Sequence, residues 1–192
     1  DHTKEIGLSV LAPSLMYNEN EINNLSILCD NSHDGFSINA GAIIANREGV
    51  NHSASLIANA HDDNINLGIT WNSSPEHFFE GSLYANAHFD YTDEEDLRIT
   101  IESDSSQAII NHSAWDLTPF KAIITPQQTA IHNFFFEKDS TQYLKIDGNI
   151  ANTTTDTLQV ELRNIDLSYL LSLVQLKGID FGGNINGHIK AA

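Results

Sequence analysis

The stretch "NINLGITW", residues 64–71, decides the fold class of this 192-residue chain. Apolar side chains occupy every second position from Ile65 to Trp71, and Asn, Gly and Thr fill the positions between them. A period of two places the apolar side chains on one face of a β-strand and the polar ones on the other. The stretch therefore predicts a strand with one apolar and one polar face.

The same alternation recurs along the whole chain. Turn sequences rich in Asn, Asp, Ser and Gly separate the runs, for example "HDDN" (61–64) and "EKDSTQ" (137–142). Their spacing, mostly about 8 to 12 residues, is typical of consecutive hairpins. We predict an all-β protein whose antiparallel strands follow one another as a meander. The further alternating runs lie at 6–10, 25–29, 36–44, 83–89, 97–101, 144–150, 158–162 and 179–189.

One segment, residues 166–175, has a helical period instead. Asp166 is placed to cap a helix and Gly178 to end it. The apolar residues between them that share one helical face are Leu167, Leu170, Leu171 and Val174. We predict a short helix here that covers an open end of the sheet.

The composition argues against nucleic acid as a partner and against a membrane-spanning helix. The chain has 26 Asp and Glu against 9 Lys and Arg, a formal charge of −17, which repels nucleic acid phosphates. No apolar stretch reaches the roughly 18 residues of a membrane-spanning helix.

The chain opens on "DHTKEIG" without an initiator methionine or a signal peptide, so we expect an internal fragment of a larger protein. We predict one elongated β domain over residues 1–192, with a looser subdivision into 1–112 and 113–192.

Motifs for catalysis or metal binding are missing. The nine histidines are dispersed, without the HxH or HExxH spacing of a zinc site. The stretch "DNSHDGFSINAG" (30–41) begins like a calcium loop, but Gly41 stands where a bidentate Glu is required. No nucleophile elbow, phosphate loop or cysteine pair occurs. We predict no enzyme activity, no catalytic residue, no metal and no cofactor.

The apolar faces of the strands have two possible uses. In a β-sandwich they meet those of a second sheet and form a core. In a curled, open sheet they line a trough, and a trough of Leu, Ile, Val and Phe suits acyl chains. The alternation alone does not separate these two arrangements.

Residues 114–189 resemble the repeating pattern of TamB-like translocation and assembly module proteins, within the AsmA-like superfamily of bacterial envelope proteins. The part of the chain upstream of residue 114 follows the same pattern less closely. The features that carry the resemblance are the strand around Trp115, the hairpin "NFFFEKDSTQYLKIDG" (133–148), the strand and helix "DTLQVELRNIDLSYL" (156–170), and the glycine-rich "FGGNINGHI" (181–189).

The resemblance implies an elongated periplasmic protein of a Gram-negative bacterium, anchored in the inner membrane by a segment outside this chain. Its strands curl into an open β-trough, also described as a β-taco or solenoid-like sheet. The apolar interior carries phospholipid acyl chains between the membranes, or the protein is a scaffold for outer-membrane protein assembly. A barrel protein of the outer membrane contacts regions outside this fragment. The family offers no catalytic residues.

The predicted groove lining combines the alternating apolar residues of both halves. It comprises Ile65, Leu67, Ile69, Leu83, Leu144, Ile146, Leu158, Val160, Leu162, Ile179, Phe181, Ile185 and Ile189.

Two alternatives stay open. A secreted or surface β-sandwich that binds carbohydrate, or mediates calcium-dependent adhesion, would expose aromatic residues on a flat face, with Trp71, Tyr84 and Trp115 as candidates. An enzyme of unrecognised type would bring carboxylates together in a polar cleft.

Overall fold

The computed structural model confirms the all-β prediction. It describes residues 6–17, 20–31, 35–45, 51–73, 79–92, 95–151, 157–166 and 183–191, and these contain strands and no helix. The predicted helix spans residues 166–175, of which 167–175 lie outside the described residues, and Asp166, its expected cap, is the last residue of a strand. In the described part, no helix is long and apolar enough to cross a membrane.

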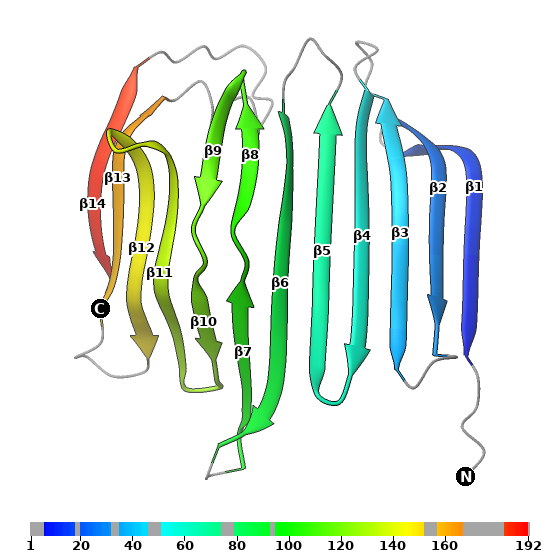
Figure 1. Cartoon of the computed structure of the whole chain (residues 1–192), viewed down its shortest axis with the longest axis horizontal. Coiled ribbons are helices and arrows are strands. Elements are labelled where there is room, and N and C mark those ends of the chain that lie inside the picture. Colours follow the sequence, from blue (N-terminus) through cyan, green and yellow to red (C-terminus); the bar gives the residue numbers. More distant parts are fainter. Residues whose placement is uncertain are drawn as a thin grey trace.

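In the described residues, fourteen strands form one antiparallel sheet (Figure 1). In its first half each strand pairs with the next along the chain. These strands are β1 (Gly7–Tyr17), β2 (Asn20–Asp30), β3 (Phe36–Ala45), β4 (Asn51–His61), β5 (Asn64–Ser73) and β6 (Phe79–Tyr91). Asp62 and Asp63 form the tight turn between β4 and β5 with φ of 44° and 59°. Two such residues suit a type I′ turn, which matches the twist of the flanking strands.

Two strands in the second half are interrupted. β7 (Leu97–Ser103) and β8 (Ser106–Ile110) pair with successive parts of β6, and β10 (Lys121–Ile124) and β9 (Ser113–Leu117) do the same along β11 (Gln128–Asp139). Backbone bonds hold the breaks in place, since Asp104 N–H donates to the Tyr84 carbonyl at 3.0 Å. The sheet ends with β12 (Gln142–Ala151), β13 (Leu158–Asp166) and β14 (Asn184–Ala191).

Three bulges keep the apolar side chains on one face. Asn24, Asn133 and Asn164 have φ of 53°, 60° and 47°, and each lies where the pairing register shifts by one residue. Asn tolerates this left-handed conformation better than most residues. The bulge absorbs the extra residue, so apolar residues three positions apart share a face. These pairs are Ile22 and Leu25, Ile131 and Phe134, and Leu162 and Ile165.

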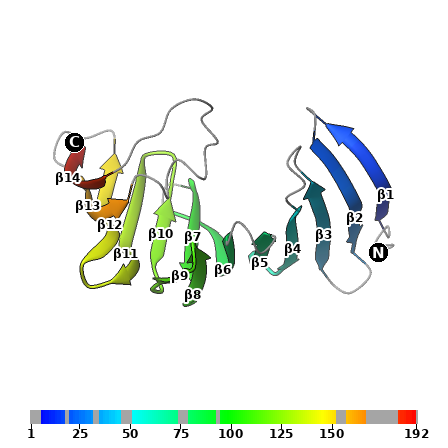
Figure 2. The same cartoon turned by 90° about the horizontal axis from the view of Figure 1, so that it is seen from above.

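The sheet is a single bent layer, and its two edges, β1 and β14, turn toward the same side (Figure 2). Ala108, Ile110, Trp115 and Ile165 form a buried cluster, and the Trp115 ring stacks on Phe136 with centroids 5.2 Å apart. Ile165 lies on β13 and Trp115 on β9, with β11 and β12 between them in the sheet. The apolar face is therefore on the inside of the bend in this region.

Candidate functional site

The pairing register places the apolar residues of the first half on one face. Leu56 of β4 pairs with Ile69 of β5, which pairs with Leu83 of β6. The row continues from Leu56 through Ala40 to Ile27 on β2. Because directly paired residues point to the same side of a sheet, an unbroken apolar row crosses five strands.

The second half repeats this arrangement. Leu144 of β12 pairs with Leu162 of β13, and Ile146 pairs with Val160, which pairs with Ile189 of β14. These residues again share one face.

One row joins the two halves. Ile65 pairs with Ala87, Ala87 with Ile101, Ile101 with Ala122, and Ala122 with Ile131, so the row runs from β5 to β11. The Asn133 bulge then keeps Phe134, the partner of Ile146, on the same side as Ile131. The predicted lining residues that the structure describes consequently all lie on one face, here called the apolar face.

The predicted lining residues are mostly half-buried on this face. Ile189 is 55% exposed, and Ile179 and Phe181 lie outside the described residues. The half-buried members are Ile65, Leu67, Ile69, Leu83, Leu144, Ile146, Leu158, Val160, Leu162 and Ile185.

No second sheet covers the apolar face within the described ranges. The accessible surface is 12648 Å², whereas a compact globular protein of this mass exposes about 9,100 Å². Leu8 and Phe36 on this face are 53% and 40% exposed. The β-sandwich of the first alternative is therefore wrong for the described residues, since the apolar faces of two sheets do not meet.

Two of the three aromatic residues proposed for that alternative lie on the apolar face. Trp71 packs on Phe79 with ring centroids 5.7 Å apart, and Trp115 is only 2% exposed. Their expected exposure on a flat face is wrong, because the register puts both in the apolar rows of the bent sheet, where Trp115 is buried and Trp71 is half-buried. Tyr84, 46% exposed, lies on the opposite face.

An apolar pocket of about 220 Å³ adjoins the buried cluster, beside the start of β8 and the end of β9. Trp71, Leu83, Phe134 and Phe136 line it, and only Leu83 belongs to the predicted lining. The three consecutive Phe residues of "NFFFEK" (133–138) do not indicate which of them share a face, nor that Phe134 and Phe136 lie near Trp71. The Trp71 Nε1 donor is buried and has no hydrogen-bond partner among the described residues.

Charged contacts lie on the opposite, polar face. Arg98 pairs with Asp90 across β6 and β7, with Nε donating to Oδ1 at 2.7 Å. This hydrogen bond lowers the pKa of Asp90 below its usual range. Lys121 Nζ donates to Glu102 Oε1 at 2.9 Å. Nowhere in the described part do three or more His, Cys, Asp or Glu side chains gather as metal ligands.

Comparison with protein-family models, with curated proteins and with solved structures finds no match to this chain. The resemblance to TamB-like proteins rests on the sequence patterns and stays a prediction.

Proposed function

We propose that this chain is a non-enzymatic segment of a TamB-like cell-envelope protein whose curled sheet is an open trough for phospholipid acyl chains. The observation that carries the proposal is one continuous apolar face on a single, bent sheet. A closed core would bury that face, whereas its aliphatic side chains stay half-exposed over both halves of the chain.

The half-exposed face can bind an acyl chain with nearly the same free energy at each point along it. Each acyl CH₂ group that leaves water gains about 0.8 kcal/mol. Leu, Ile, Val and Ala supply most of the rows, so one rung offers an acyl chain nearly the same environment as the next. The acyl chain is therefore bound without one strongly preferred position and slides along the face.

The pocket beside Trp71 adds a place for the methyl end of an acyl chain. Its walls are apolar, with Trp71, Leu83, Phe134 and Phe136 among the residues that line it. An acyl chain end that enters this pocket leaves water without burying a polar group.

The location and the partners in this proposal come from the family resemblance. The fragment lies in the periplasm, and a segment outside it anchors the parent protein in the inner membrane. Phospholipid then moves between the two membranes, or the sheet is a scaffold for outer-membrane protein assembly. The barrel partner contacts regions outside the fragment.

The proposal is tested by native mass spectrometry with lipid extraction on the chain purified from an envelope-targeted expression strain. We expect phospholipid to co-purify with the wild type and to be lost from folded Leu67→Asp and Ile146→Asp variants. The matched control is Ile57→Asp, because Ile57 is an aliphatic residue of β4 on the polar face and is 50% exposed. This variant should keep its lipid.

Two outcomes contradict the trough. A wild type that is free of lipid leaves the sheet as a spacer or scaffold. Equal lipid retention by Ile146→Asp and Ile57→Asp shows that the lipid does not sit on the apolar face. Circular dichroism of each variant confirms that the sheet has formed.

A further inference from the structure

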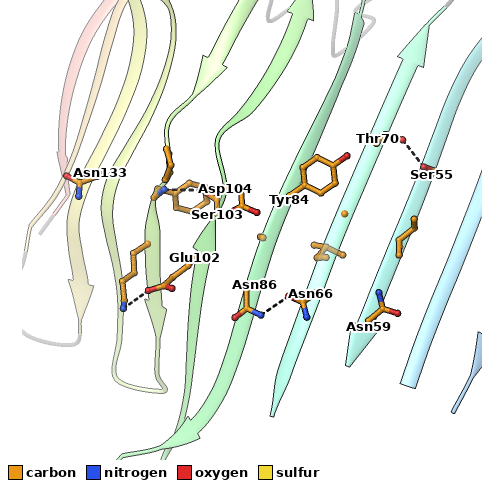
Figure 3. Close-up of a pocket in the computed structure, with 17 residues that line it drawn as sticks. Ser55, Asn59, Asn66, Thr70, Tyr84, Asn86, Glu102, Ser103, Asp104 and Asn133 are labelled. Atoms are coloured by element: carbon orange, nitrogen blue, oxygen red, sulfur yellow. Dashed lines mark hydrogen bonds and ion pairs between the residues drawn. The ribbon is translucent and has the colours of Figure 1, made fainter. Parts of the chain in front are cut away.

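The polar face carries a groove for which the proposed trough has no use. It has a volume of about 690 Å³ and crosses β4, β5, β6, β7 and β10 (Figure 3). At a strand spacing of about 4.8 Å, these five neighbouring strands span roughly 19 Å. The groove is therefore long enough for an extended ligand of several units.

The strand interruptions build one wall of this groove. Ser103 N–H donates to the Phe120 carbonyl at 3.0 Å, and Phe120 N–H donates back to Ser103 Oγ at 2.9 Å. These two bonds tie the break after β7 to the break before β10. Asp104, Pro119 and Phe120 line the groove from these breaks, whereas uninterrupted strands would leave a smoother sheet surface.

Tyr84 supplies an aromatic platform inside the groove. Its ring rests against Gly68 on the next strand, where any added Cβ would meet Cε1 and Cδ1 at 3.1 and 3.2 Å. The side chain is nevertheless 46% exposed. It points from β6 toward Thr70 of β5 (Figure 3). One side of the ring is thus supported by backbone while the rest is open to a ligand.

Hydrogen-bonding groups surround this platform. Asn86 Nδ2 donates to Asn66 Oδ1 at 3.1 Å, and the hydroxyls of Ser55 and Thr70 are 2.7 Å apart. Each Asn amide has two donor hydrogens and an acceptor oxygen, so a single bond between the two leaves capacity for a ligand. Amides that both donate and accept match ligand hydroxyls, which do the same.

We propose that this groove binds a neutral oligosaccharide, with Tyr84 stacking on the apolar face of a sugar ring. An aromatic ring covers the C–H groups of a sugar, and the amides and carboxylates around it bond to the hydroxyls. The charge of −17, together with Glu102 and Asp104 in the groove, disfavours anionic glycans. Lys121 pairs with Glu102 at 2.9 Å and offsets that charge, so Asp104 leaves the groove lining with a net negative charge.

The test uses four probes, cellohexaose, maltohexaose, mannohexaose and the hexamer of N-acetylglucosamine, and isothermal titration calorimetry. We expect the wild type to bind at least one of them and Tyr84→Ala to bind it at least about tenfold more weakly. The matched control is Tyr91→Ala, since Tyr91 lies on the same strand, is 70% exposed and is outside the groove. Its affinity should equal that of the wild type.

Two further variants keep the test decisive. Asn86→Ala removes an amide from the groove and should also weaken binding, even where Tyr84→Ala folds poorly. Ile146→Asp, on the apolar face, should leave sugar binding unchanged, so failure of the lipid trough and failure of this site are distinguishable. A wild type that binds none of the four probes, or a folded Tyr84→Ala and a folded Asn86→Ala that both bind like the wild type, overturns the proposal.

Discussion

The N-terminal region, β1 to β4, and the C-terminal region, β6 to β13, follow the same alternation but bury their apolar face to different extents. Every buried side chain among the described residues lies between Ser73 and Ile165, whereas Leu8 and Val10 of β1 are 53% and 38% exposed. The C-terminal region contains both strand interruptions and two of the three Asn bulges. Alternation decides which side chains share a face. The interruptions and bulges depart from this alternation, and most of them lie in the region where the bent sheet buries those side chains.

The proposed trough therefore has two parts that differ in burial. The N-terminal part is an open surface, whereas the C-terminal part buries an apolar cluster around Trp115, which stacks on Phe136. An acyl chain would be more completely covered in the second part, where the sheet encloses it.

The largest expected effect compares one apolar residue from each region. Trp115→Ala should lower the free energy of unfolding by about 3–5 kcal/mol, because it removes a buried ring stacked on Phe136. Leu8→Ala should cost less than about 1 kcal/mol, because Leu8 is 53% exposed. Urea denaturation measures both. Equal losses would mean that the two regions do not differ in burial in solution.

The second prediction uses a motif that occurs in β12 as "IDGNI" (146–150) and in β14 as "INGHI" (185–189). Gly148 has φ of +116°, and an added Cβ would lie 2.2 Å from the Thr157 carbonyl oxygen, whereas at Gly187 it would meet Leu162 Cδ1 at 3.8 Å. Gly148→Ala should therefore cost at least about 2 kcal/mol and Gly187→Ala less than about 1 kcal/mol. Thermal and urea unfolding measure the two losses of stability. A larger loss for Gly187→Ala than for Gly148→Ala would contradict the described geometry of β12.

The third prediction concerns a device that both regions share. Asn24 in β2 and Asn133 in β11 each hold a positive φ at a bulge. A β-branched residue is strained there, so Asn24→Val and Asn133→Val should each cost about 1–3 kcal/mol. Asn→Gly at the same positions is the control and should be close to neutral, because Gly adopts this conformation freely. A destabilisation confined to Asn133→Val would show that the N-terminal bulge is dispensable.

The smallest effect is a pH dependence in the turn between β11 and β12. Asp139 Oδ1 accepts hydrogen bonds from the Thr141 hydroxyl, the Thr141 N–H and the Gln142 N–H, which lower the pKa of Asp139 below its ordinary 3.8. A lowered pKa stabilises the fold above the ordinary value, and this contribution disappears as the pH falls through the folded value. Asp139→Asn should therefore lose less stability than the wild type between pH 6 and pH 2, as measured by urea midpoints. An identical pH dependence would rule out this role.

The strands and their faces were predictable because alternation is a local property of the chain. "NINLGITW" became β5 with Ile65, Leu67 and Ile69 on one face, and "HDDN" and "EKDSTQ" contain the turns at Asp62–Asp63 and Ser140–Thr141. The turn at Asn111 and His112, with φ of 47° and 62°, was missed. Its "NH" pair lacks the Gly that usually marks such a turn.

Features that depend on pairing between distant strands were not predictable in the same way. The breaks at 104–105 and 118–120 look like ordinary turns in "SDSSQ" and "TPFK", yet each strand continues along the same neighbour. The polar groove around Tyr84 exists because these breaks lie side by side and because Gly68 is opposite the ring. Local pattern shows that Tyr84 belongs to the polar face, but it contains no information about this wall.

Pairing between consecutive strands has a consequence for how the molecule forms. Apart from the pairings of β7 with β10, β6 with β8 and β9 with β11, the pairings between the described strands join strands that follow one another in the sequence. Most strand pairings then join sequence neighbours through a short connection, so little loop-closure entropy is lost before each pairing begins. The sheet can grow one hairpin at a time from a nucleus, and each added hairpin extends the apolar face without rearranging the strands already in place.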